Sequence, residues 1–154
     1  MGEKKHSFNL VFTLALLGIF ALSALFVAVL GAQVYGRTAE QMDANYNTRT
    51  SLVYITEKIR QCPGKDISID TVDGKQALVM KQDTDGKSYE SWIYNANGKL
   101  KEVTVPAGEK VKAGDGQEIM DIEDFALKPD GNLIRILVFD QSGNRDSVTV
   151  SVRD

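Results

Sequence analysis

The alternation of hydrophobic and polar positions changes character twice along the chain. Residues 8–35 form a mainly apolar run of 28 residues with no charged residue and no proline. A membrane-spanning helix needs about 20 such residues. We therefore predict a transmembrane helix over residues 8–35. A short tail at residues 1–7 would precede it, and one domain at residues 36–154 would follow it, since that length suits a single domain.

From residue 37 to residue 62 the pattern is that of an amphipathic helix. This stretch contains no proline and no glycine. Its apolar residues recur at helical spacing and so share one face, which consists of Leu52, Ile55, Ile59 and Cys62. Proline cannot continue a helix and glycine accepts the reversed backbone, so Pro63 and Gly64 would end it. The prediction is one continuous helix over residues 8–62.

After residue 64 the apolar positions recur at every second residue, and turn residues follow at short intervals. This pattern is typical of β-hairpins. The predicted strands cover residues 67–69, 76–82, 88–94, 99–105, 133–139 and 147–152. Residues 107–116 are a predicted loop, and residues 117–128 are ambiguous. The run 133–139 is the most apolar, which favours a central strand. Val148, Val150 and Val152 share a face that the apolar helix face would cover. The fold class is therefore α+β, a long N-terminal helix packed on a small antiparallel sheet.

Composition and charge argue against several classes of function. From Arg37 onward the chain has 16 Lys and Arg against 20 Asp and Glu, so a nucleic-acid partner is not expected. Residues 115–124 hold five acids and no base, which indicates a solvated loop or sheet edge. The single histidine, His6, lies in the tail, so no His-dependent catalytic or metal site can form in the domain.

The single cysteine, Cys62, excludes an intramolecular disulfide and a cysteine metal cluster. It is interpreted as a buried apolar residue, with a disulfide to another subunit as the alternative. Asp83-Thr84-Asp85-Gly86 resembles the start of a calcium loop, but its glycine comes too early and a hairpin turn fits better. No catalytic motif is found, so we predict no enzyme activity, no cofactor, no metal and no small-molecule substrate.

The charges that flank the apolar run favour one orientation in the membrane. Lys4 and Lys5 precede the run and Arg37 follows it, which favours a cytoplasmic N-terminus and an extracytoplasmic domain. A cleavable signal peptide is the alternative, with a weak cleavage site at Val34-Tyr35-Gly36. The run is about twice the usual length of a signal-peptide core, so an uncleaved anchor is preferred.

Small residues recur within the span and define a possible packing face for other membrane helices. They are Gly18, Ala21, Ala24, Ala28 and Ala32. The last three are four residues apart and lie along one side of a helix, where small side chains allow close approach in lipid. Alanine as ordinary apolar filler is the alternative. The predicted partners are the lipid bilayer and other membrane helices.

This layout resembles that of type IV pilins and pseudopilins, in which a long N-terminal helix packs on a sheet of about four strands. Several segments are more closely similar to an uncharacterised family of pilin-like single-pass membrane proteins of Gram-positive bacteria. They are Gly31–Tyr35, Asn45–Tyr46, Arg49–Leu52, Tyr54–Gln61, Ser91–Tyr94 and Leu133–Phe139. The resemblance implies a pilin-like subunit of a secretion, pilus or competence-type envelope assembly, with other pilin-like subunits as partners.

The sequence departs from prepilins at the processing site. Prepilins carry glycine just before the cleaved bond and glutamate at the fifth mature position. If Phe8 were the first mature residue, Ser7 and Phe12 would occupy those positions. We therefore expect the chain to keep its N-terminus. The alternative function is an anchored sensor or binding module that does not polymerise.

Overall fold

The computed structural model describes residues 3–62 and 66–152, with side chains from residue 8 onward. The chain divides into two compact units, Met1–Gln41 and Met42–Asp154, and each is described by itself. The elements are α1 (Glu3–Gln61), β1 (Ile67–Val72), β2 (Lys75–Thr84), β3 (Lys87–Ala96), β4 (Lys99–Pro106), β5 (Gln117–Asp121), β6 (Asp124–Asp130), β7 (Leu133–Phe139) and β8 (Arg145–Ser151). The predicted α+β fold is confirmed.

Helix α1 begins at Glu3, five residues before the predicted start of the span, and ends at Gln61. Its last turn carries Lys58 and Arg60, whose positive charges are favourable beside the carbonyl end of a helix. Pro63 and Gly64, predicted to stop the helix, lie outside the described residues. The absence of proline from Glu3 to Gln61 is the local reason that one helix can continue through 59 residues.

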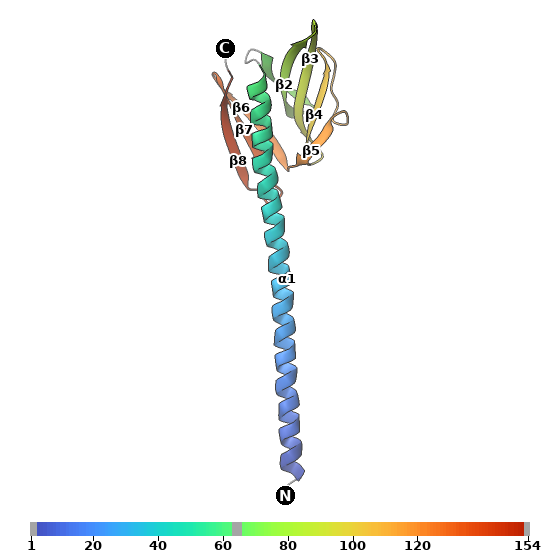
Figure 1. Cartoon of the computed structure of the whole chain (residues 1–154), viewed down its shortest axis with the longest axis vertical. Helices are drawn as coiled ribbons and strands as arrows, with labels where there is room; N and C mark the ends of the chain where they lie inside the picture. Colours follow the sequence, from blue (N-terminus) through green and yellow to red (C-terminus); the bar gives the residue numbers. More distant parts are fainter. Residues whose placement is uncertain (1–2, 63–65, 153–154) are drawn as a thin grey trace. The chain divides into compact units, whose positions relative to one another are not determined.

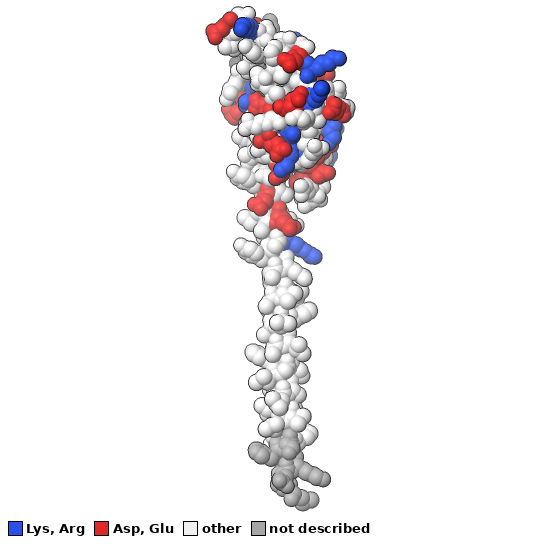
Figure 2. Space-filling view, turned by 90° about the vertical axis from the view of Figure 1, so that its right-hand side faces the viewer, with Lys and Arg blue, Asp and Glu red and all other residues white. Residues whose placement is uncertain are grey.

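The part of α1 in the first unit is apolar and open on all sides. It contains a candidate membrane span, and none of its most apolar window is buried inside the protein. Three hydroxyl groups form their hydrogen bonds within the helix, each donating to a carbonyl oxygen one turn earlier. They are Thr13 to Asn9 at 2.8 Å, Ser23 to Ile19 at 2.6 Å and Thr38 to Val34 at 2.9 Å. Such internal satisfaction is what a low-polarity solvent requires. Charged side chains are concentrated on the second unit (Figure 2).

The second unit contains two antiparallel sheets where the sequence predicted one. The first has the order β1-β2-β3-β4-β5 and the second the order β6-β7-β8. The predicted strands all form, and β7 is the central strand of its sheet as expected. In Figure 1, the C-terminal part of α1 has β6, β7 and β8 on one side and the strands β2 to β5 on the other.

The two sheets separate inside the segment that the sequence left ambiguous. Residues 117–128 form strand β5 and most of strand β6. The Ile122 N–H donates to the Gly98 carbonyl, while the Glu123 N–H donates to the Phe139 carbonyl. Consecutive residues therefore bond to different sheets, and the chain changes sheet at this point.

Three tight turns set the register of the larger sheet. Each has a pair of central residues with positive φ, at Asp73-Gly74, Asp85-Gly86 and Asn97-Gly98. Two such residues define a type I′ turn, whose twist matches that of the flanking strands, and Asp-Gly and Asn-Gly are its preferred sequences. The hairpin turn predicted at residues 83–86 in preference to a calcium loop is confirmed, and the Ser88 hydroxyl donates to the Asp83 carboxylate beside it.

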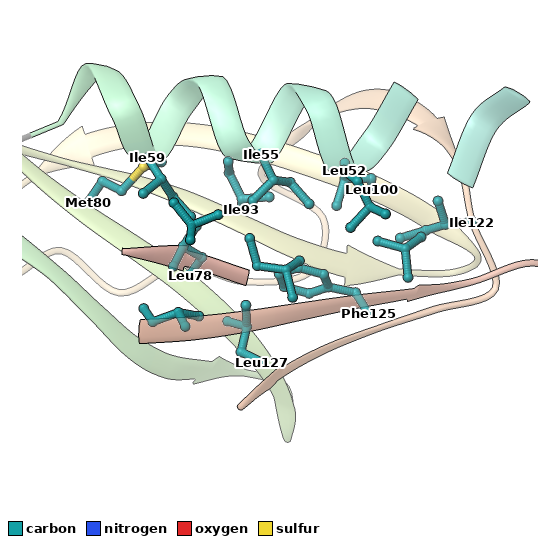
Figure 3. Packing of buried hydrophobic residues seen from close by; sticks show 14 of the residues in the cluster. Leu52, Ile55, Ile59, Leu78, Met80, Ile93, Leu100, Ile122, Phe125 and Leu127 are labelled. Carbon is teal, nitrogen blue, oxygen red and sulfur yellow. The ribbon is translucent and has the colours of Figure 1, made fainter. Parts of the chain in front are cut away.

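The main core lies between α1 and both sheets. Leu52, Ile55 and Ile59 point from α1 toward side chains of both sheets (Figure 3), and none of the three is more than 6% exposed. The side chains they meet include Leu78, Ile93, Leu100, Phe125, Leu127 and Val150. Val148 and Val152 pack against the same cluster, so α1 covers the β8 face as predicted.

A second, smaller core covers the opposite face of the larger sheet. It contains Trp92 and Tyr94 of β3, and the loop at residues 107–116 contributes Val111 and Ala113. The Tyr94 hydroxyl donates to the Lys112 carbonyl at 3.1 Å and accepts from the Gly116 N–H at 2.9 Å. These bonds hold the loop against the sheet.

Candidate functional site

The small residues predicted to form a packing face all lie on α1 in the first unit. Gly18 is half-buried, and the alanines of the set are exposed: Ala21, Ala24, Ala28 and Ala32. A Cβ built on Gly18 or Gly31 would meet no atom within 4 Å. This surface of α1 is therefore open for a neighbour from outside the chain.

The second predicted set lies at the junction of α1 with the sheets. Leu52, Ile55, Ile59 and Cys62 all belong to the main core and are 0% to 7% exposed. The structure brings them together through the sheets β1–β5 and β6–β8, whose inner faces meet this side of α1.

An uncovered side of α1 in the second unit carries exposed apolar residues, with Arg49 and Arg60 on the same side. Met42, Tyr46 and Val53 are 67%, 69% and 61% exposed. At 3.6 residues per turn these three positions lie within about 40° of one another, roughly 130° around the helix from the centre of the buried face. The burial of the other face shows that these three side chains point outward.

A polar cluster that sequence reasoning missed joins α1 to β4. The Lys58 ammonium donates to Glu102 Oε1 at 2.6 Å, and the Tyr54 hydroxyl donates to Glu102 Oε2. Lys58 Nζ also lies 5.4 Å from the centre of the Tyr54 ring. Tyr54 and Lys58 are four residues apart on one side of the helix, a spacing that brings side chains together. Only the pairing of β4 with β3 in the sheet brings Glu102 to them.

The cluster shifts the titration of both helix residues. The hydrogen bond to Glu102 raises the pKa of Lys58, with burial opposing it. Burial raises the pKa of Tyr54, and the hydrogen bond to Glu102 adds to that increase. Lys58 therefore stays charged and Tyr54 neutral throughout the physiological range.

Cys62 is buried, as predicted. Its thiol is 3.5 Å from the Lys81 carbonyl oxygen, and burial, aided by nearby Asp66, raises the pKa of the thiol. A thiolate is the reactive form of cysteine, so this side chain is poorly suited to forming a disulfide with another subunit.

A buried carboxylate organises the turn between β7 and β8. Asp140 is 4% exposed, and its side chain accepts from the Ser142 N–H at 2.9 Å, the Asn144 N–H at 2.8 Å and the Asn144 amide at 3.0 Å. These bonds satisfy the carboxylate within the turn, so its role is structural. Across residues 8–62 and 66–152, no three His, Cys, Asp or Glu side chains are arranged to hold a metal ion.

A comparison with known protein families gives a match that covers most of the second unit. Residues 46–141 match the family described as Domain of unknown function (DUF4860). No curated protein and no solved structure shows significant similarity to the chain. Because residues 46–141 are more than half of the sequence, the chain belongs to this domain of unknown function family, DUF4860.

Proposed function

We propose that this protein is a single-pass, membrane-anchored structural component: a pilin- or pseudopilin-like subunit of a cell-envelope assembly of the secretion or pilus type. The observation that carries the proposal is the division of α1. One stretch is apolar all round and uncovered, and the other packs its own domain on one side only. Such a helix supplies an anchor and a lateral surface at once.

The lateral surface in the second unit supports contact with another helix. Met42, Tyr46 and Val53 present a stripe of exposed apolar side chains, whereas exposed apolar residues on a solvated helix are usually scattered. In the first unit, the small residues Ala24, Ala28 and Ala32 offer the close approach that membrane helices use.

Cysteine crosslinking in native membranes tests this lateral contact. Met42→Cys should form a disulfide-linked species under mild oxidation, because the thiol would face a neighbouring subunit. Asp43→Cys is the matched control, since it is also exposed but lies about 100° further around the helix. Equal crosslinking at both positions, or none at either, would contradict the proposal. Cys62 is buried and can remain in both variants.

The proposed orientation places the N-terminus in the cytoplasm and the domain outside it. It rests on Lys4 and Lys5 before the span against Arg37 after it. A membrane-impermeant maleimide should label a cysteine at exposed Lys128 on intact cells. Labelling only after the cells are opened would reverse the orientation.

A further inference from the structure

Edge strand β8 differs from the other exposed strand edges of the domain. Natural proteins protect sheet edges with charges, bulges, short strands or covering groups, because an open edge pairs readily with another strand. The two sheets have four edges, formed by β1, β5, β6 and β8. Comparing their protection identifies the one that is open.

Three of the four edges carry a recognisable block. Strand β5 has five residues, two of them acidic, and its pairing with β4 contains a register shift. Strand β1 has six residues and carries Asp70. On β6, the Gln76 side chain occupies the edge like a strand: its amide donates to the Leu127 carbonyl at 3.1 Å, and its carbonyl accepts from the Leu127 N–H at 2.8 Å.

Strand β8 carries Arg145 and Asp146 at its start and has no such block beyond them. Residues 147–152 read SVTVSV, without charge, proline or glycine, and valine and threonine favour strands. The Val152 N–H donates to the Asn132 carbonyl at 2.8 Å, toward β7. Because these groups alternate in an antiparallel pair, the backbone groups of Ser147, Thr149 and Ser151 point away from β7. The Ser147 N–H donates to the Asp146 carboxylate, and the N–H groups of Thr149 and Ser151 have no partner among the described residues.

A groove follows this edge, with α1 as its other wall. Near the start of β8 is a hollow of about 280 Å³, lined by Asn45, Thr48, Arg49, Asp140, Asn144, Arg145 and Asp146. Near the end of β8 is a hollow of about 650 Å³, lined on the helix side by Thr56 and residues 59–62 and on the strand side by residues 149–152. The exposed lining of this second hollow is mainly polar, and Ile59, Ile67 and Val150 contribute apolar atoms to it. An added strand would therefore find space for alternate side chains as well as backbone partners.

The charges beside the groove indicate which strand it would accept. Arg49 and Arg145 are exposed and form no ion pair within the described part of the chain. Arg60 lines the other end, paired at 3.0 Å with Glu57, and both of these side chains are more than half exposed. Asp140 and Asp146 line the same hollow as Arg49 and Arg145 and keep their negative charge, but their carboxylates accept backbone N–H groups and form no ion pair with either arginine within the described residues. Between the arginines the groove is uncharged.

We propose that this groove binds an extended peptide segment of a partner protein. The segment adds to β8 as a further strand, places apolar side chains against Ile59, Ile67 and Val150, and pairs acidic side chains at its two ends with Arg49 and Arg60. These arginines are eleven positions apart on the helix, a span of about 16 Å that corresponds to roughly five strand residues. This function is independent of the pilin-like assembly proposed above.

Fluorescence anisotropy with the full chain in detergent micelles tests the proposal. The probe is a capped, fluorescein-labelled peptide of sequence DTVTVTD, in which both acids and both valines share one strand face. It should bind, and binding should protect the Thr149 and Ser151 amides from hydrogen exchange. The peptide KTVTVTK reverses the end charges, and DTVPVTD cannot form a regular strand; both should bind at least about tenfold more weakly.

Matched variants separate strand addition from other modes of binding. Thr149→Pro removes an outward N–H without removing a bond to β7, and proline is tolerated at such edge positions. It should weaken binding of DTVTVTD by at least about tenfold, while Thr149→Ala, which keeps the N–H, should bind within about twofold of the parent. Arg49→Glu should weaken DTVTVTD and strengthen KTVTVTK. Unchanged thermal unfolding of each variant confirms that the fold is intact.

Several results would overturn the proposal. One is no binding of DTVTVTD at millimolar concentration, and another is equal binding by the parent and Thr149→Pro. Concentration-dependent self-association that Thr149→Pro abolishes would assign the edge to a second copy of this chain. Binding of anionic lipid vesicles through Arg49 and Arg145, unaffected by Thr149→Pro, would assign the arginines to a membrane surface.

Discussion

Two stretches of the same helix make opposite use of hydrophobic residues. Residues 8–35 are apolar in every direction and none of their most apolar window is buried, whereas residues 42–61 bury one side and leave the other exposed. A helix that is apolar on all sides is suited to a lipid environment, because lipid contacts all its sides equally. A one-sided apolar surface selects a protein neighbour. The comparison shows that the pattern of apolar residues, and not their number, determines what a helix packs against.

The largest effect is expected from the buried side of the second stretch. Ile55 is fully buried, so Ile55→Ala should lower the free energy of unfolding of the domain by about 2–5 kcal/mol. Val53 lies two residues away and is 61% exposed, so Val53→Ala should change it by less than about 0.5 kcal/mol. Denaturant unfolding followed by the fluorescence of Trp92 measures both. Similar losses for the two variants would contradict the one-sided packing.

A charge placed in the first stretch should oppose membrane insertion. Leu22→Arg puts a guanidinium inside the predicted span, at a cost of about 2.5–3.5 kcal/mol near the centre of a bilayer. Met42→Arg is the control, because Met42 lies outside the span and is exposed. Carbonate extraction of membranes measures the inserted fraction. If Leu22→Arg inserted as well as Met42→Arg, residues 8–35 would not be the anchor.

The polar cluster on the second stretch predicts a pH dependence. Glu102→Gln should lower stability at neutral pH by about 1 kcal/mol, a value reduced by the partial exposure of Lys58. The folded-state pKa values of Lys58 and Tyr54 are both raised, so their contribution is complete below the unfolded pKa values and is lost as pH rises through the folded ones. The difference between Glu102→Gln and the parent should therefore shrink above about pH 10.

Thermal unfolding between neutral pH and pH 11 measures this difference. Glu109→Gln is the control, since Glu109 is exposed and lies in a loop. A constant difference between Glu102→Gln and the parent at all pH values would show that Glu102 acts only through packing.

The smallest effect is expected at the small-residue face of the first stretch. Ala28→Ile should weaken association with a membrane partner by up to about 1 kcal/mol, because the larger side chain prevents close approach of two helices. The stability of the second unit should not change, since Ala28 lies in the first. Crosslinking yield of Met42→Cys with and without Ala28→Ile measures the effect. No change in yield would leave Ala28 as apolar filler.

The sequence predicted individual elements better than their assembly. Local signals were sufficient for α1 and for the hairpins, because helical spacing and the Asp-Gly and Asn-Gly pairs act over a few residues. The two sheets were not predicted. The change of sheet at Ile122 and Glu123 depends on bonds to Gly98 and Phe139, which are distant in the chain. The sequence contains one local signal of this change of sheet. Ile122 and Phe125 are both buried although they are three residues apart, which breaks the period of two expected for a single strand.

The same limit applied to the sites. The buried side of α1 could be predicted because its period is contained in the helix itself. The contacts of Tyr54 and Lys58 with Glu102, and the groove between α1 and β8, bring together residues more than 40 positions apart. No spacing rule relates such residues, because the turns and the pairing of strands determine their distance.

A spin-label scan along α1 tests the central claim most directly. Single cysteines from residue 12 to residue 60 would carry a nitroxide, in a chain reconstituted into bilayers with buried Cys62 replaced by serine. The account predicts uniformly high accessibility to oxygen and none to aqueous nickel across residues 12–34. From residue 42 onward it predicts a period of 3.6, with minima at Thr48, Leu52, Ile55 and Ile59. Aqueous accessibility across residues 12–34, or no periodicity after residue 42, would contradict it.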